Sequence, residues 1–284
     1  MAQLSYNNGG TAHTRKKRSF LSSNPVMRRL NNVDEYSETD SATYSGITLK
    51  TGLFLLFTLG GVIIHLGLEN ALAVGQTFDI NYKGFTVTMY TNEAIALIAS
   101  VVLAIVFQLL AFFVRSSTPV SGALYCITQG YFISFLIFKV LKGYEYLGGL
   151  ALLITMLIVL TMAGLYSAHI IRVTKKFKTV MITLVVTMVA TSIFTFIGYF
   201  IPFTRQLVQS LAQNYVLSIA VSVIFIIIAS LFLICDFDTI ENVVENKLPK
   251  KYEWQAAFGL AFTVVWIYLK VLELIITIAG KKKN

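Results

Sequence analysis

Seven long apolar runs occupy the chain between residues 46 and 279, and they constrain its fold more than any other feature. A helix of about 20 apolar residues crosses the hydrocarbon core of a bilayer, which is about 30 Å thick. The runs are continuous and do not alternate with a period of two, so they predict helices rather than barrel strands. The sequence therefore predicts an all-α membrane protein, a bundle of seven transmembrane helices at 46–68, 92–114, 119–140, 147–170, 178–201, 213–235 and 254–279.

The composition excludes the other broad classes of protein. Hydrophobic residues make up 56% of the chain and charged residues only 13%, whereas a soluble domain needs about 25% charged residues to cover its surface. The polar, Gly/Pro or Cys bias of a disordered, fibrous or disulfide-rich chain is also missing. Because basic residues of membrane proteins set topology and attract anionic lipid, the net charge of +9 predicts lipid contacts and no nucleic-acid partner.

The first 45 residues differ from everything that follows. They hold the basic clusters Arg15–Arg18 and Arg28–Arg29 and then an acidic patch, with no apolar stretch of the kind that a secretory signal needs. We therefore expect three parts: a charged, disordered cytoplasmic tail over 1–45, a seven-helix transmembrane domain over 46–280, and a basic C-terminal tail over 281–284. The tail is expected to lie near anionic lipid.

The distribution of Lys and Arg predicts the orientation. If the N-terminus is cytoplasmic, fifteen basic residues fall on that side and seven on the other, which favours a multi-pass protein of the cell membrane with an external C-terminus. The terminal lysines disagree with this rule, and a re-entrant or short final segment would instead place them inside. Abundant Ile, Lys and Asn suggest a bacterial plasma membrane. The seven external residues are Lys83, Lys139, Lys142, Arg205 and Lys281–Lys283.

The connection over 69–91 predicts a β-hairpin. Apolar residues alternate on both sides of Lys83-Gly84, a dipeptide suited to a tight turn. We expect this hairpin to lie over the external mouth of the bundle.

Ionisable residues inside the apolar runs are the candidates for function, because each is costly in lipid unless it is paired or hydrated. When the sixth run is continued as a helix, Asp236 lies near its apolar stripe, so Asp236 is the candidate inward-facing carboxylate. Asp238, Glu241 and Glu245 are predicted to form a solvated cytoplasmic face. No nucleophile–base pair or phosphate loop is present, so we expect no enzyme activity and no cofactor.

The seventh run contributes two more candidates. Lys270 and Glu273 are three residues apart, so they can pair on one helical face. Their height along the helix leaves two arrangements open: a bridge from Lys270 to Asp236 of the sixth run, or placement at the outer interface with the charges reaching water. Gln129, in the third run beside Gly130, is the other polar side chain expected in a central cavity.

Several blocks of sequence resemble the bacterial branch of the Bax-inhibitor-like (transmembrane BAX inhibitor motif) family. They are 23–30, 42–51, 236–241, 252–260 and 266–269. The resemblance implies a seven-helix fold with the last helix at the centre and a pH-sensitive leak for cations, particularly calcium. In that family a carboxylate at the end of helix six pairs with an acidic residue of helix seven. Asp236 matches the first position, but Lys270 stands at the second, and Gln129 stands where this branch often has Glu.

Two functions follow from these features. The first is a pH-sensitive cation leak, of Ca²⁺ or H⁺, gated around Asp236 with Lys270 or Glu273 as partner and with only a transient cation contact at Asp236. The second is a non-conducting regulatory protein that uses its charged tail to bind and modulate a membrane protease or another membrane complex.

Overall fold

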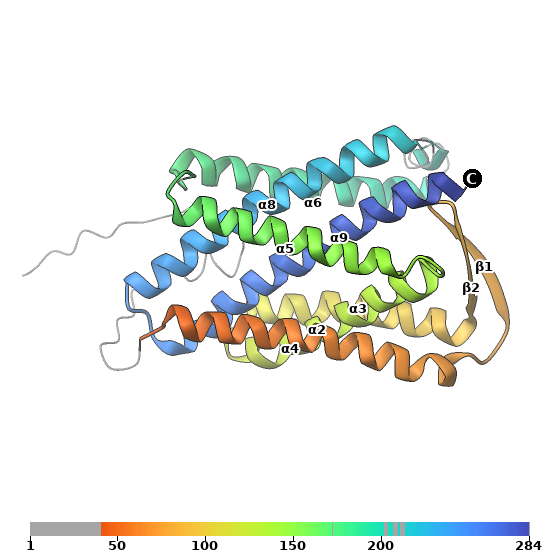
Figure 1. The fold of residues 1–284 in the computed structure, drawn as a ribbon, viewed down its shortest axis with the longest axis horizontal. Coiled ribbons are helices and arrows are strands. Elements are labelled where there is room, and N and C mark those ends of the chain that lie inside the picture. The colour runs from red at the N-terminus through yellow and green to blue at the C-terminus, as the bar shows by residue number, and fades with distance from the viewer. Residues whose placement is uncertain (1–40, 172, 202–203, 207–209, 211–213, 284) are drawn as a thin grey trace, which may run out of the picture.

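A computed structural model describes residues 41–171, 173–201, 204–206, 210 and 214–283. Seven helices within these residues are long and apolar enough to cross a membrane, which confirms the predicted seven-helix bundle (Figure 1). They are α2 (Tyr44–Leu72), α3 (Thr91–Phe113), α4 (Thr118–Phe135), α5 (Tyr146–Ser167), α6 (Lys175–Phe200), α8 (Tyr215–Glu245) and α9 (Glu253–Lys283).

Local sequence signals set several helix ends. Thr43, Thr174 and Asn214 precede α2, α6 and α8, and each side chain accepts a hydrogen bond from a backbone N–H of the first turn. Pro119 lies in the first turn of α4, where its missing N–H is harmless. Helix α8 continues to Glu245, ten residues beyond the apolar run, because Thr239, Ile240 and Val243 keep one side of it buried.

Helix α9 lies at the centre of the bundle. It contacts α2, α4, α5 and α8, and Figure 1 shows it crossing diagonally between the α2–α4 and α5–α8 pairs. In its most apolar stretch 44% of the residues are buried, against 12% in peripheral α6. The expectation of a central last helix is therefore confirmed.

Helices α2 and α4 approach each other closely because glycines stand at their contact. A Cβ atom on Gly61 would lie 2.0 Å from the carbonyl oxygen of Ile127, and one on Gly130 would lie 1.9 Å from that of Thr58. Both distances are far below van der Waals contact, so only glycine fits at either position. This is the role that small residues commonly have between membrane helices.

A β-hairpin crosses one end of the bundle, beside the C-terminal end of α9 (Figure 1). Strands β1 (Thr77–Tyr82) and β2 (Phe85–Tyr90) pair antiparallel around Lys83 and Gly84, whose φ angles are 49° and 87°, as an I′-type turn requires. Phe85, Val87 and Met89 of β2 are buried against the bundle. The predicted hairpin is confirmed, and we call this end of the molecule the hairpin end.

The opposite end carries the connection from α8 to α9, and we call it the Pro249 end. The chain is docked there before α2 begins, because the N–H of Ala42 donates to the carbonyl of Leu248 and Ser41 pairs with Pro249. Helix α2 thus starts inside the expected tail 1–45, and α9 continues through most of the expected C-terminal tail to Lys283. The basic clusters Arg15–Arg18 and Arg28–Arg29 lie outside the described residues.

Candidate functional site

Three carboxylates lie along the central helix α9 at three levels, two of them on α9 itself and one on α8. Glu253 opens the helix, Asp236 of α8 reaches it at Thr263, and Glu273 lies near the hairpin end. Successive levels are ten residues apart, which is about 15 Å along a helix axis. Together the three levels span about the thickness of a hydrocarbon core.

The middle level is the most enclosed. Asp236 has no exposed surface, and its Oδ2 accepts a hydrogen bond from the hydroxyl of Thr263 at 2.5 Å. The same hydroxyl lies 3.2 Å from the carbonyl oxygen of Gly259. One turn nearer the hairpin end, the rings of Phe232 and Trp266 lie 5.9 Å apart across the same two helices. The carboxylate is therefore held between α8 and α9 beneath an aromatic pair.

The structure corrects one of the two arrangements left open for Lys270. Its ammonium pairs with Glu273 Oε2 at 2.9 Å, so the predicted i, i+3 pair is confirmed, and it lies 5.1 Å from the ring centre of Phe225. The bridge to Asp236 is absent from the ion pairs of the described residues. Asp236 meets α9 at Thr263, seven residues or about 10 Å below Lys270, which is too far for a direct contact.

The upper level ties the hairpin to α9. The ammonium of Lys83, at the hairpin turn, donates to Glu273 Oε1 and to the Thr277 hydroxyl, both at 2.9 Å. Glu273 thus lies between two lysines, Lys83 and Lys270. The carbonyl oxygen of Lys83 would be only 1.8 Å from a Cβ atom on Gly280, so the turn rests directly on the helix.

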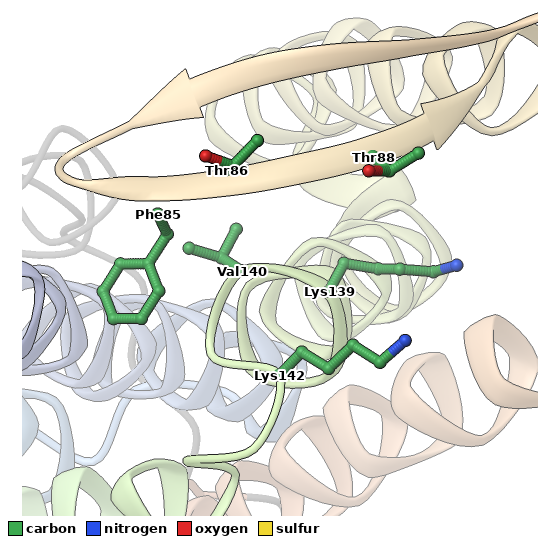
Figure 2. Close-up of a pocket in the computed structure, with 6 residues that line it drawn as sticks. All are labelled: Phe85, Thr86, Thr88, Lys139, Val140 and Lys142. Carbon is green, nitrogen blue, oxygen red and sulfur yellow. The ribbon is translucent and has the colours of Figure 1, made fainter. Parts of the chain in front are cut away.

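A second charged cluster joins helix ends beneath the hairpin. Lys139 pairs with Glu69 at 3.0 Å and with Glu93 at 2.8 Å. It belongs to the π-helical turn η2 (Leu136–Val140). A cavity of about 230 Å³ lies beside it, lined by Phe85, Thr86, Thr88, Lys139, Val140 and Lys142 (Figure 2). Since two carboxylates already engage Lys139, this cluster is a connection between helices.

The lower level closes the Pro249 end. The buried carboxylate of Glu253 forms an ion pair with Lys50 of α2 and accepts hydrogen bonds from the backbone N–H of Thr43 at 2.9 Å and from its hydroxyl at 3.2 Å. It therefore fixes the start of α2 to the start of α9. The 3₁₀ turn η3 (Lys250–Tyr252) precedes it, and there the Tyr252 hydroxyl accepts from Arg115 at 2.8 Å.

The predicted solvated acidic face of α8 is only partly correct. Asp238 accepts from Lys178 of α6 at 2.5 Å, and Glu241 accepts from the hydroxyl of Tyr166 of α5. Both side chains are half-buried because α5 and α6 pack beside this part of α8. Glu245, at the end of the helix, is exposed as expected.

Two glutamines have different surroundings. Gln255 of α9 is 1% exposed, and neither its amide nitrogen nor its amide oxygen has a hydrogen-bond partner among the described residues. Gln129 of α4 is half-buried, and no hydrogen bond in the described part of the chain links it to Asp236. The structure therefore does not bring Gln129 into the middle level, whereas Gln255 lies between the lower and middle levels.

Sequence reasoning did not find Thr263, Gln255 or Glu253. Thr263 could have been noticed, since it and Tyr268 are the only residues with a hydroxyl between 256 and 269. Glu253 lies at a helix start, where an acidic residue has an ordinary role with the helix dipole, so its sequence position gave no sign of burial.

Seven apolar helices packed around the last one define a polytopic α-helical membrane protein. The chain belongs to the Bax inhibitor 1 like family, whose family model matches residues 24–280 of the 284. The family and fold expected from the resemblance are thereby confirmed. Comparisons with curated proteins and with solved structures found no match.

Proposed function

We propose that this protein is a pH-sensitive cation leak whose pathway is closed, in this conformation, where Asp236 meets Thr263. The observation that carries the proposal is a carboxylate with no exposed surface, hydrogen-bonded to the Thr263 hydroxyl where α8 packs against the central helix α9. The resemblance to the family favours calcium as the cation.

The Thr263 hydroxyl supplies a route to pH dependence. It has one proton and two neighbouring acceptors, Asp236 Oδ2 and the Gly259 carbonyl oxygen. When Asp236 is ionised, the hydroxyl donates to the carboxylate. When Asp236 is protonated, the acid donates to Thr263 Oγ1, and that hydroxyl turns to Gly259. The contact therefore accommodates both protonation states, but the ionised one buries a charge.

The cost of that buried charge sets the direction of gating. Asp236 has no exposed surface in this conformation, and its ionised form gains hydration when water reaches it, so its ionisation promotes separation of α8 and α9 and entry of water. Protonation removes the charge and favours the closed contact. We therefore expect the leak to increase as pH rises through the titration of Asp236, with the hydrated carboxylate attracting cations.

Two lysines of the helices near Asp236 pair with other carboxylates. On α6, Lys178 pairs with Asp238, and toward the hairpin end Lys270 pairs with Glu273. Lys270 therefore pairs with Glu273 and not with Asp236.

The test is cation flux into liposomes that contain the purified protein, measured from about pH 5 to about pH 8. Wild type should leak Ca²⁺ with a rate that rises with pH, and Asp236→Asn, which holds the side chain neutral, should stay low throughout. Thr263→Val keeps the carboxylate and should shift the midpoint. Asp79→Asn is the matched control, because Asp79 lies exposed on β1. Flux no greater than that of empty liposomes, or unchanged by Asp236→Asn, contradicts the proposal.

We also propose that the protein lies in the cell membrane with its N-terminus in the cytoplasm and the hairpin end outside. The distribution of Lys and Arg supports this orientation. The regulatory alternative stays a prediction, since the charged tail on which it rests lies outside the described residues.

A further inference from the structure

A large groove opens on the side of the bundle at the height of the upper carboxylate level, and Glu273 is not among the residues that line it. It has a volume of about 1160 Å³ and lies between the first turns of α5, the first turns of α8 and the last turns of α9. Its walls are almost wholly apolar and include Leu150, Ile154, Ile227 and Ile275. Among the described residues, none that lines it is acidic.

The groove arises because α5 and α8 separate toward the hairpin end. Near the Pro249 end, the Tyr166 hydroxyl donates to Glu241 and joins the two helices. Toward the hairpin end the two helices leave the face of α9 between Val271 and Lys281 uncovered. Figure 1 shows α9 ending between them at this end of the molecule.

The depth of the groove matches one leaflet of a bilayer. The lining residues of α9 run from Val271 to Lys281, a separation of ten positions that spans about 15 Å along the helix. Half of a hydrocarbon core is also about 15 Å. An acyl chain that enters from the leaflet at the hairpin end would therefore lie along the groove for its full depth.

The mouth of the groove has the chemistry of a membrane interface. Tyr144, Tyr146 and Tyr215 line it together with Lys281, whose ammonium lies 4.1 Å from the ring centre of Tyr215. Tyrosines are enriched at the level of lipid headgroups, and a lysine there attracts phosphate. The charge that the described lining residues carry is thus positive, at Lys281, and it stands where a headgroup would lie.

We propose that this groove binds an anionic phospholipid, with an acyl chain along α9 and the phosphate at Lys281 and the tyrosine hydroxyls. The apolar walls of the groove favour binding of an acyl chain, and the lysine at its mouth favours a headgroup with a net negative charge. This site is separate from the Asp236–Thr263 contact and does not depend on whether the protein conducts ions.

The test is native mass spectrometry of delipidated protein titrated with phosphatidylglycerol or with phosphatidylcholine. Wild type should retain phosphatidylglycerol preferentially. Lys281→Gln should reduce that preference about fivefold, the effect of one interfacial basic residue. Leu150→Trp, which fills the groove, should abolish retention of both lipids, and Ile227→Trp repeats the test from α8.

The controls separate the groove from the general lipid surface. Leu103→Trp on α3 adds the same bulk to another exposed apolar face, and Lys176→Gln removes an exposed lysine from the other end of the bundle. Both should bind lipid as wild type does. Equal retention of the two lipids by wild type, or wild-type retention by both tryptophan variants, overturns the proposal. So does a dimer that Ile227→Cys crosslinks through this groove, because a second copy would then occupy it.

Discussion

At the scale of single residues, the central finding is that Asp236 has a hydroxyl partner. The resemblance to the family places Lys270 where a second carboxylate is expected. In the structure, Lys270 forms an ion pair with Glu273, and Asp236 accepts a hydrogen bond from Thr263. A hydroxyl can both donate and accept, so it serves either protonation state of the acid. A lysine in that position would have favoured the ionised state alone.

Gln255 provides a prediction about the closed conformation. A buried amide whose two ends have no partner among the described residues costs about 1–3 kcal/mol, whereas an apolar side chain of similar shape avoids that cost. Gln255→Leu should therefore raise the thermal unfolding temperature in detergent and lower the leak at every pH. Gln129→Leu, at a half-buried position of α4, should change neither. Lower stability of Gln255→Leu would show that the amide is satisfied in the folded protein.

Tyr82 predicts an alkaline transition at the hairpin. Tyr82 keeps 37% of its surface exposed, but desolvation by the surrounding chain, assisted by the negative charge of Glu273, raises its pKa from 10.0 to about 12. An acid whose pKa is raised by folding contributes stability below its unfolded pKa and loses it as pH rises toward the folded value. The hairpin should therefore loosen between pH 10 and pH 12. Its cleavage by a protease should increase over that range in wild type and much less in Tyr82→Phe.

At the scale of elements, the close contact between α2 and α4 can be tested with two neighbouring glycines, one at the contact and one away from it. Gly61→Ala places a Cβ atom 2.0 Å from the Ile127 carbonyl oxygen, whereas Gly60→Ala, one residue away, meets nothing within 4 Å. Forcing the helices apart should destabilise the bundle by about 1–3 kcal/mol. Thermal unfolding in detergent should show a clear drop for Gly61→Ala and none for Gly60→Ala. Equal behaviour of the two variants would mean that the helices do not meet at Gly61.

The elements themselves were largely predictable, but the partners of their charged residues were not. Seven apolar runs and the Lys83-Gly84 turn gave the helices and the hairpin, because length, periodicity and turn chemistry are local properties. Asp238 and Glu241 were misplaced because their burial depends on α5 and α6, which lie far away in the sequence. The predicted Asp236–Lys270 bridge was wrong for a related reason. Asp236 lies about 10 Å from the height of Lys270 along α9, and the relative axial position of two helices cannot be predicted from the sequence of either one.

At the scale of the whole molecule, orientation is a direct prediction. The two native cysteines, Cys126 and Cys235, are buried, so an introduced cysteine reports its own side of the membrane. With the N-terminus in the cytoplasm, Thr86→Cys on the hairpin should react with an impermeant maleimide on intact cells. Lys250→Cys should react only after the cells are opened. The reverse pattern would invert the topology and contradict the rule based on Lys and Arg.

The three carboxylate levels divide the bundle into two fixed ends and a middle contact. Glu253 and Glu273 fix the two ends of α9 to α2 and to the hairpin through lysines, and the Asp236–Thr263 contact lies between these two ends. Paired ends and a titratable middle suit a bundle that stays assembled while its centre opens. Separation of α8 from α9 would then be local rather than a general loosening of the fold.

The protonation of Asp236 tests this account most directly. Infrared difference spectra of the protein in lipid, recorded while pH is raised from about 5 to about 8, report loss of the carboxylic acid C=O band. We expect wild type to show a carboxylic acid band that disappears over the pH range in which its flux rises. The band should be absent from Asp236→Asn and shifted in Thr263→Val. A wild-type spectrum identical to that of Asp236→Asn, or a titration separated from the rise in flux, would contradict this account.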